Sequence, residues 1–193
     1  MTTPLLPRID LEITTDGSWD GGLGGCAFAI MQQDGRCAGK IWRTRHDTDS
    51  TAVELKGIRG ALDTLLSAVV ARPFDFPASE TKYAAIWTDC LDAVCEIDLQ
   101  LGGRSEDAIR RSNGRVSSVT HVDLVKAIVD AKSALEAKGV VTRVAWQPRV
   151  SYPQAKAADE WARKGVVLAR QKAGSWNVGL DHVYPKPKYF SAY

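Results

Sequence analysis

The stretch that decides the fold is "EITTDGSW", residues 12–19. It continues an alternation of apolar residues that ends at Ile13, a pattern typical of a half-buried β-strand. The alternation runs into an ionisable side chain, Asp16, which Gly17 follows. Asp and Gly favour turns, so this stretch alone predicts a strand over residues 8–15 and then a turn. The alternative is a carboxylate held at the end of the strand for a functional reason.

The rest of the chain changes from strand patterns to alternating helices and strands. Asp34-Gly35 is a strong hairpin signal between the second and third strands. Strands that are followed by alternating helices and strands indicate an α/β fold, with an antiparallel edge, a parallel half and helices as cover. The strands are predicted over residues 25–33, 36–45, 83–89 and 140–146, and the helices over 50–70, from about 91, over 121–139 and over 153–170.

Length and composition restrict the class of protein. A chain of 193 residues with 45% hydrophobic content is expected to form one domain over 1–193. A net charge of +2 is weak support for a polyanionic partner. The chain has neither a signal-peptide pattern nor an apolar run of about 18 residues, so we expect a cytoplasmic protein without a membrane segment. Its four cysteines lack CxxC spacing, which favours free thiols over structural zinc.

A second aspartate repeats the pattern of the opening stretch. "AIWTDC" places Asp89 after an apolar strand and a threonine, as Asp16 follows the first strand. If the two strands are parallel neighbours, the two carboxylates lie close together. Ligand sites of open α/β sheets lie beyond these carboxyl ends.

Two further acids stand on the apolar faces of helices. Glu54 shares a face with Ile58 and Leu62, and Asp159 shares a stripe with Ala162. For either acid alone, a buried salt bridge or a cap is the commoner explanation. Four such acids without an obvious set of interior Lys or Arg favour a cation site, and clustered carboxylates suit Mg²⁺ or Mn²⁺.

These residues resemble the bacterial type of the ribonuclease H family. The resemblance is carried by Asp16-Gly17-Ser18, "STAVEL" at a helix start, "WTD", "HVDLVKAIVDA" and "DEWAR", and it extends over about residues 8–171. It implies a mixed five-stranded sheet flanked by helices, in which the first three strands are antiparallel and the fourth and fifth are parallel to the first. Residues 172–193 then form an aromatic and proline-rich tail.

The resemblance also implies an activity. The family cuts the RNA strand of RNA–DNA hybrids and leaves 5′-phosphate and 3′-hydroxyl ends. Two Mg²⁺ or Mn²⁺ ions roughly 4 Å apart support this chemistry. The residues implied as metal ligands are Asp16, Glu54, Asp89 and Asp159.

The expected partner is an RNA–DNA hybrid bound by a monomer. Basic residues before and within the helix that starts near residue 121 could follow a phosphate backbone, although a solvated charged surface is an equal alternative. Trp19 could stack on a sugar or base. The residues expected to contact substrate are Gly17, Ser18, Trp19, Ser50, Thr51, Arg110, Arg111, Arg115 and Lys126.

The sequence departs from the family at groups that sense 2′-hydroxyls and transfer protons. Ser50 and Thr51 replace the usual Asn or Gln, and Cys90-Leu91 replaces Ser-Gln. Arg149 falls where the family has a mobile histidine. Arginine cannot act as a base near neutral pH, but it can bind phosphate and stabilise developing charge. We therefore expect Arg149 to be catalytic, with slower turnover or product release.

Two alternatives stay open. Asp10 and Glu12 form a D-x-E pair that would suit a 3′–5′ exonuclease of the same superfamily, although Ala155 stands where that class has His or Tyr. The second alternative is a module of the same fold that binds nucleic acid without cutting it.

Overall fold

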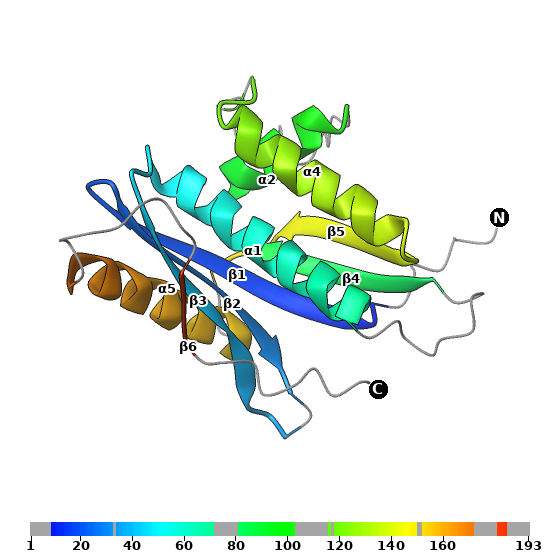
Figure 1. Ribbon diagram of the computed structural model, residues 1–193, viewed down its shortest axis with the longest axis horizontal. Helices are drawn as coiled ribbons and strands as arrows, with labels where there is room; N and C mark the ends of the chain where they lie inside the picture. The colour runs from blue at the N-terminus through cyan, green and yellow to red at the C-terminus, as the bar shows by residue number, and fades with distance from the viewer. Residues whose placement is uncertain are drawn as a thin grey trace.

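The protein forms one mixed sheet with helices on both faces (Figure 1). The computed structural model describes residues 9–32, 34–71, 81–102, 116, 118–149 and 152–171, and the backbone of 181–184. In chain order the elements are β1 (Leu11–Asp20), β2 (Leu23–Met31), β3 (Cys37–Arg45), α1 (Ser50–Ala71), β4 (Lys82–Thr88), α2 (Leu91–Gln100), α4 (Val122–Glu136), β5 (Val140–Trp146), α5 (Pro153–Gln171) and β6 (Asp181–Tyr184).

The strand order is β5-β4-β1-β2-β3-β6. Strands β1, β2 and β3 are antiparallel neighbours, whereas β4 is parallel to both β1 and β5. This arrangement confirms the predicted α/β class and the predicted relative directions of the five strands. The sixth strand was not predicted. It comes from the segment expected to be a tail and pairs with β3, and four residues are too few for periodicity to indicate a strand.

The first strand does not end before Asp16. It continues to Asp20, and the turn falls at Gly21 and Gly22, with φ of +55° and +90°. The predicted end at residue 15 was wrong because β2 pairs with the whole of this stretch, from Thr14 to Asp20. The ladder of backbone hydrogen bonds outweighs the local turn preference of Asp-Gly, and Asp16 therefore lies within a strand.

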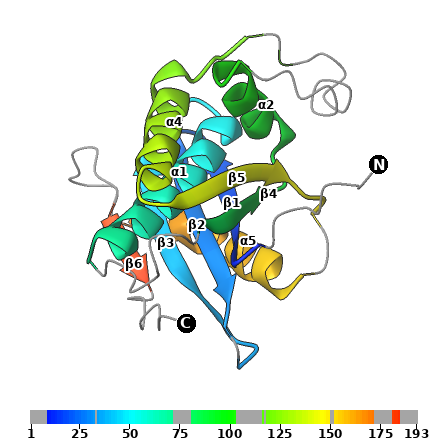
Figure 2. The same ribbon diagram turned by 90° about the vertical axis from the view of Figure 1, so that its right-hand side faces the viewer.

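The sheet separates two apolar clusters. Figures 1 and 2 show the helices on its two faces, α1 and α4 on one and α5 on the other. Side chains of α1 and α4 form the larger cluster with Ile13, Phe28 and Trp42 on one face. On the other face, α5 packs on β1, β2 and β3, where Ala162 meets Ala27. The alternation of side chains along β2 is therefore the reason that one strand serves both cores.

Helix α5 lies directly against the backbone of β2. A Cβ atom on Gly25 would lie 2.5 Å from the Val166 nitrogen and would also overlap the Ala162 carbonyl. Gly165 faces it from the helix, and a Cβ there would lie 2.6 Å from the Gly25 Cα. This glycine contact fixes the height of α5 above the sheet, and with it the position of Asp159, which α5 carries.

A histidine connects the helices of the other layer. The buried Glu96 of α2 accepts hydrogen bonds from the backbone N–H groups of Thr120 (3.1 Å) and His121 (2.9 Å). The ring nitrogens of His121 lie 2.9 Å from Glu96 Oε1 and 3.2 Å from Asp49 Oδ2. Asp49 in turn accepts from the Ala52 N–H at the start of α1. With both nitrogens engaged, His121 holds the helix ends together.

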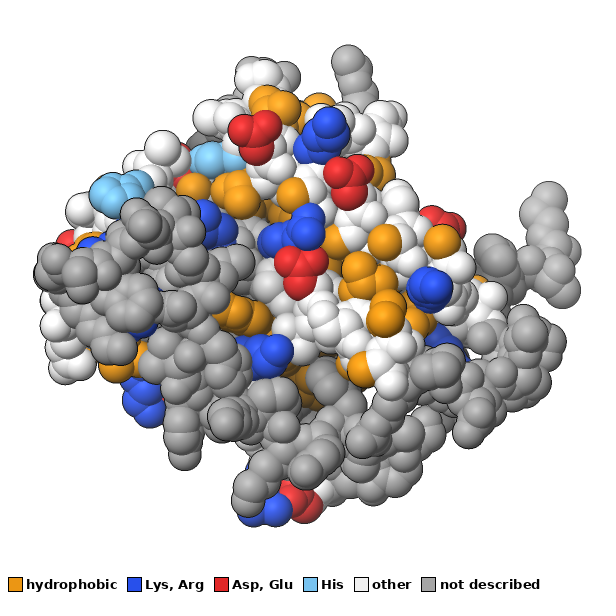
Figure 3. Space-filling view, viewed as in Figure 1, with side chains coloured by type: hydrophobic (Ala, Val, Ile, Leu, Met, Phe, Trp, Pro, Cys, Tyr) orange, Lys and Arg blue, Asp and Glu red, His pale blue; other side chains and the backbone are white. Residues whose placement is uncertain are grey.

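The described surface is mixed in character. Figure 3 shows acidic, basic and hydrophobic side chains interspersed over the described part of one face. In the described ranges, no helix combines the length and the hydropathy needed to cross a bilayer.

The glycine contact gives a stability prediction. We expect Gly25→Ala to lower the free energy of unfolding by about 2–3 kcal/mol, because its Cβ would push α5 off the sheet. Gly57→Ala is the matched control. Its Cβ would meet no atom closer than 3.4 Å, and alanine favours a helix over glycine by up to about 1 kcal/mol. Urea unfolding of both variants checks this, and equal stability of the two would contradict it.

Candidate active site

The register of β1 and β4 brings the two strand aspartates together. The parallel ladder runs from Leu11↔Ala84 to Thr14↔Trp87. Asp16 and Asp89 each lie two residues beyond its last pair, so they are neighbours at the same edge. This is the proximity that their matching positions in the sequence predict.

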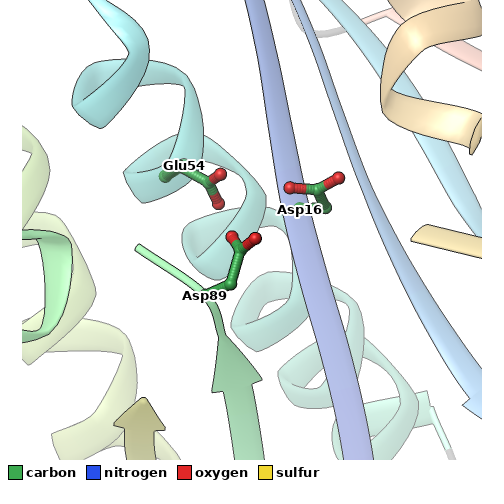
Figure 4. A group of neighbouring side chains, drawn as sticks. All are labelled: Asp16, Glu54 and Asp89. Atoms are coloured by element: carbon green, nitrogen blue, oxygen red, sulfur yellow. The ribbon is translucent and has the colours of Figure 1, made fainter. Parts of the chain in front are cut away.

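Three carboxylates converge at this edge. Figure 4 shows Asp16 from β1, Glu54 from α1 and Asp89 from the end of β4 pointing toward one another. One oxygen of each lies within 4.8 Å of the others. Asp16 and Glu54 are buried, at 5% and 6% exposure. Groups of like charge that are this close together and this deeply buried repel strongly unless a bound cation or protonation neutralises them.

A glycine and a threonine hold this cluster in place. A Cβ on Gly17 would lie 2.8 Å from the Glu54 backbone nitrogen, so only glycine lets β1 pass this close to α1. The Gly17 backbone nitrogen lies 3.0 Å from Asp16 Oδ1, and its N–H also donates a hydrogen bond to the Glu54 carboxylate. The Thr88 hydroxyl donates to Glu54 Oε2 at 3.2 Å and accepts from the Cys90 N–H. The carboxylates are therefore oriented by groups of their own scaffold.

Burial and repulsion raise the pKa values of the cluster. Burial, and then the nearby Asp89 carboxylate, raise the pKa of Asp16 to about 7. Burial and the charges of Asp16 and Asp89 raise the pKa of Glu54 well above its usual value. Within the described residues, Asp16 Oδ2 is buried without a hydrogen-bond partner. A buried carboxylate oxygen in this state is unfavourable unless a cation completes it.

The donor atoms fit a hard divalent cation. Oxygen ligands from clustered carboxylates suit Mg²⁺ or Mn²⁺, whereas thiolates favour softer metals. Cys90 is the nearby sulfur, and burial raises the pKa of its thiol to about 12. Because this thiol stays neutral, the site offers oxygen ligands.

Asp159 joins the same pocket from α5. The pocket is lined by Thr14, Thr15, Asp16, Asp89, Gln147, Pro148, Arg149, Ala155 and Asp159. Asp159 is outside the group of three mutually close carboxylates and forms ion pairs instead. Its Oδ1 lies 3.2 Å from Arg149 and its Oδ2 lies 2.9 Å from Arg163. Arg149 also contacts Asp89, at 3.1 Å.

The fold has counterparts among solved structures. RNase H1 of the archaeon Halobacterium salinarum NRC-1 matches 82% of this chain and 98% of its own, with a TM-score of 0.51 and 17% identity. LC11-RNase H1, isolated from compost, matches 84% of this chain and 99% of its own, with a TM-score of 0.54 and 15% identity. The PFV RNase H domain matches 84% of this chain and 97% of its own, with a TM-score of 0.52 and 13% identity.

The chain has the ribonuclease H fold. The likeness lies in the structure, because no protein-family model and no curated protein matches the sequence. Within this ribonuclease H fold the three clustered carboxylates lie where parallel β1 and β4 end, and α5 closes the pocket from the other face.

The other predicted site residues are not among those that line the pocket. Trp19 is 41% exposed, and its indole N–H donates to the Asp47 carbonyl at 3.2 Å. Ser18 is half-buried, and Ser50 is exposed at the start of α1. Thr51 lies within hydrogen-bonding reach of Cys90. Lys126 is exposed on α4, whereas Arg110, Arg111 and Arg115 lie outside the described residues.

Sequence reasoning missed residues that support the acids. Thr88 orients Glu54, and the Trp146 indole N–H donates to the Asp89 carbonyl at 3.1 Å. Gln147 enters the pocket directly after β5, where the carboxyl-end rule could have found it. The link from Arg163 to Asp159 was predictable as an i,i+4 pair on α5.

The D-x-E pair of the exonuclease alternative lies elsewhere. Asp10 and Glu12 are exposed near the start of β1 and do not line the pocket. Asp10 Oδ2 accepts the Tyr83 N–H at 2.9 Å, so it closes the β1–β4 ladder at the opposite end from Asp16. The described geometry therefore gives no support to a site built on this pair.

The raised pKa of Asp16 predicts a pH dependence of stability. Between about pH 4 and pH 7 the unfolded chain has released this proton, whereas the folded, metal-free protein keeps it. Because the folded state binds more protons there, rising pH lowers the free energy of unfolding. We expect Asp16→Asn in EDTA to gain about 2–3 kcal/mol relative to the unmodified protein between pH 5 and pH 8.

Urea unfolding of both proteins at the two pH values measures this difference. Groups distant from Asp16 cancel in the comparison. Glu54 does not cancel, because the Asp16 charge raises its pKa, and removal of that charge in Asp16→Asn adds to the expected gain. A difference that is the same at pH 5 and pH 8 would show that Asp16 titrates normally.

Proposed function

We propose that the protein is a nuclease that hydrolyses the RNA strand of RNA–DNA hybrids with divalent metal ions. The observation that carries this proposal is the group of three converging carboxylates, in which a buried oxygen of Asp16 has no hydrogen-bond partner among the described residues. It is supported by the fold shared with LC11-RNase H1, a protein whose structure has been determined in complex with an RNA/DNA hybrid.

The four acids would hold the metal. Asp16, Glu54 and Asp89 offer one oxygen each within 4.8 Å, and Asp159 completes the pocket wall. We propose Mg²⁺ or Mn²⁺, with two ions when substrate is present. Bound ions would supply the charge that activates water, stabilises the phosphorus centre and supports the 3′ leaving oxygen. The expected products carry 5′-phosphate and 3′-hydroxyl ends.

The protein's own groups orient the acids and the substrate. Thr88 and Gly17 fix the Glu54 carboxylate by hydrogen bonds, and Trp146 anchors the backbone of Asp89. Because these partners lie on strands of the sheet, we expect little reorganisation on substrate binding. The Arg149 guanidinium is exposed at the pocket mouth, where it can bind a phosphate through two parallel hydrogen bonds.

We propose that substrate contacts surround this pocket. The Trp19 ring is half-exposed with its N–H fixed on Asp47, so it can stack without losing much side-chain freedom. Ser50 and Thr51 begin α1, the helix that carries Glu54, and hydroxyl groups can bond to a 2′-hydroxyl. The full proposed set is Gly17, Ser18, Trp19, Ser50, Thr51, Arg110, Arg111, Arg115 and Lys126.

A module that binds hybrids without cutting them is the second candidate. The ion pairs of Arg149 with Asp89 and Asp159 favour it, because they neutralise two of the four acids. Retention of an unpaired Asp16 oxygen favours catalysis. A single domain over 1–193, a monomeric state and a cytoplasmic location stay predictions from the sequence.

Cleavage assays test the proposal. Purified protein with Mg²⁺ or Mn²⁺ is incubated with labelled RNA–DNA hybrid, duplex DNA and duplex RNA in parallel. We expect cleavage of the RNA strand of the hybrid, and binding without cleavage under both metals would instead establish the second candidate. We expect Asp16→Asn and Asp89→Asn to lower kcat at least about 100-fold, because each loses a metal ligand.

Asp10→Asn is the matched control. It changes the same residue type directly before the strand that carries Asp16, and outside the pocket. We expect it to cleave like the unmodified protein. Loss of cleavage in this variant, with Asp16→Asn still active, would replace the proposed site by the exonuclease pair.

A further inference from the structure

Two carboxylate positions that share Asp89 lie at the carboxyl ends of β1 and β4, and they differ in their other neighbours. The deep position comprises Asp16, Glu54 and Asp89. Within the described part of the chain, no lysine or arginine forms an ion pair with Asp16 or Glu54. The shallow position lies between Asp89 and Asp159, and there a cation of the protein itself is present.

That cation is the Arg149 guanidinium. Its Nε lies 3.1 Å from Asp89 Oδ2, and its terminal nitrogen lies 3.2 Å from Asp159 Oδ1. A guanidinium keeps its charge at all ordinary pH values, so this contact persists wherever the acids are ionised. One side chain thus bridges carboxylates from β4 and α5, the two elements that define the shallow position.

The bridge is reversible. The Arg149 side chain is 66% exposed, whereas Asp89 and Asp159 are 22% and 28% exposed. Ion pairs of such exposed groups are weak. A nucleic-acid phosphate can bind the same guanidinium through two hydrogen bonds. Arg149 can therefore exchange the two carboxylates for a phosphate.

We propose that Arg149 is an internal competitor for the second divalent ion. Before nucleic acid binds, the guanidinium occupies the shallow position, and the protein takes up one ion at the deep position. A second ion enters when Arg149 turns to a phosphate. This inference rests on the proposed function only in treating the deep carboxylates as a divalent-ion site.

Substrate binding and uptake of the second ion are therefore coupled. Substrate removes the competing cation, and by linkage the second ion strengthens substrate binding by the same factor. An arginine at this position thus suppresses full metal loading of the free protein.

Calorimetric titration of Mn²⁺ into the metal-free protein, without nucleic acid, tests the inference. We expect one ion per chain for the unmodified protein. We expect Arg149→Ala to bind a second ion at least about ten-fold more tightly than the unmodified protein does. The added ion should disappear in the double variant Arg149→Ala/Asp159→Asn, which removes a ligand of the shallow position.

Arg163→Ala is the matched control. It removes the same charge from the same aspartate, but among the described residues Arg163 forms an ion pair with Asp159 and not with Asp89, and it comes from within α5. We expect it to change binding of the second ion less than about three-fold. Thermal unfolding followed by circular dichroism verifies that all variants are folded. Both arginine side chains are exposed, so we expect their replacement to leave the fold intact.

Each outcome has one meaning. Identical isotherms for the unmodified protein and Arg149→Ala would overturn the inference, as would an equal gain in Arg163→Ala. Binding of no Mn²⁺ by any variant would overturn both the inference and the proposed metal site. A second ion in Arg149→Ala, together with no cleavage of hybrid by the unmodified protein, would sustain the inference and refute the proposed activity.

Discussion

Repulsion among three enclosed carboxylates is the constraint to which the rest of this structure responds. Asp16, Glu54 and Asp89 approach within 4.8 Å of one another, two of them nearly dry. No arrangement of this kind improves stability, since buried like charges oppose folding. The protein tolerates it because hydrogen bonds from Gly17 and Thr88 orient the oxygens and because elevated pKa values let the cluster hold protons until a cation binds.

The scaffold keeps these groups together by close contacts between backbones. Gly17 lets β1 approach α1 from one face. Gly25 and Gly165 let α5 lie against β2 on the other. Helices that cannot move away from the sheet carry their acids at fixed heights, so the carboxylates from four separate elements stay in register with the strand ends. Rigid elements position functional groups more accurately than loops do.

Much of this organisation was predictable from periodicity alone. The alternation before Asp16 and the apolar run before Asp89 predicted two strands with acids at corresponding points, and the helical stripe predicted the burial of Glu54. The end of β1 was not predictable, because the local preference of Asp16-Gly17 for a turn gives no sign of the ladder that β2 provides.

Contacts between distant segments lie beyond such patterns. The bridge from Arg149 to Asp89 and Asp159 depends on the direction of an exposed side chain that carries no periodic signal. The support that Trp146 gives to the Asp89 carbonyl joins positions that are far apart in the chain. Position along a strand could be inferred from the sequence, whereas the partner of each polar group required coordinates.

The sixth strand has a consequence for handling the protein. β6 covers the outer edge of β3 by pairing with Ile41, Trp42 and Arg43. A version of the chain cut after Gln171 would leave those backbone groups open to strands of other molecules. Uncovered sheet edges promote aggregation, so shortened versions of this protein would be prone to self-association through β3, at a distance from the acidic pocket.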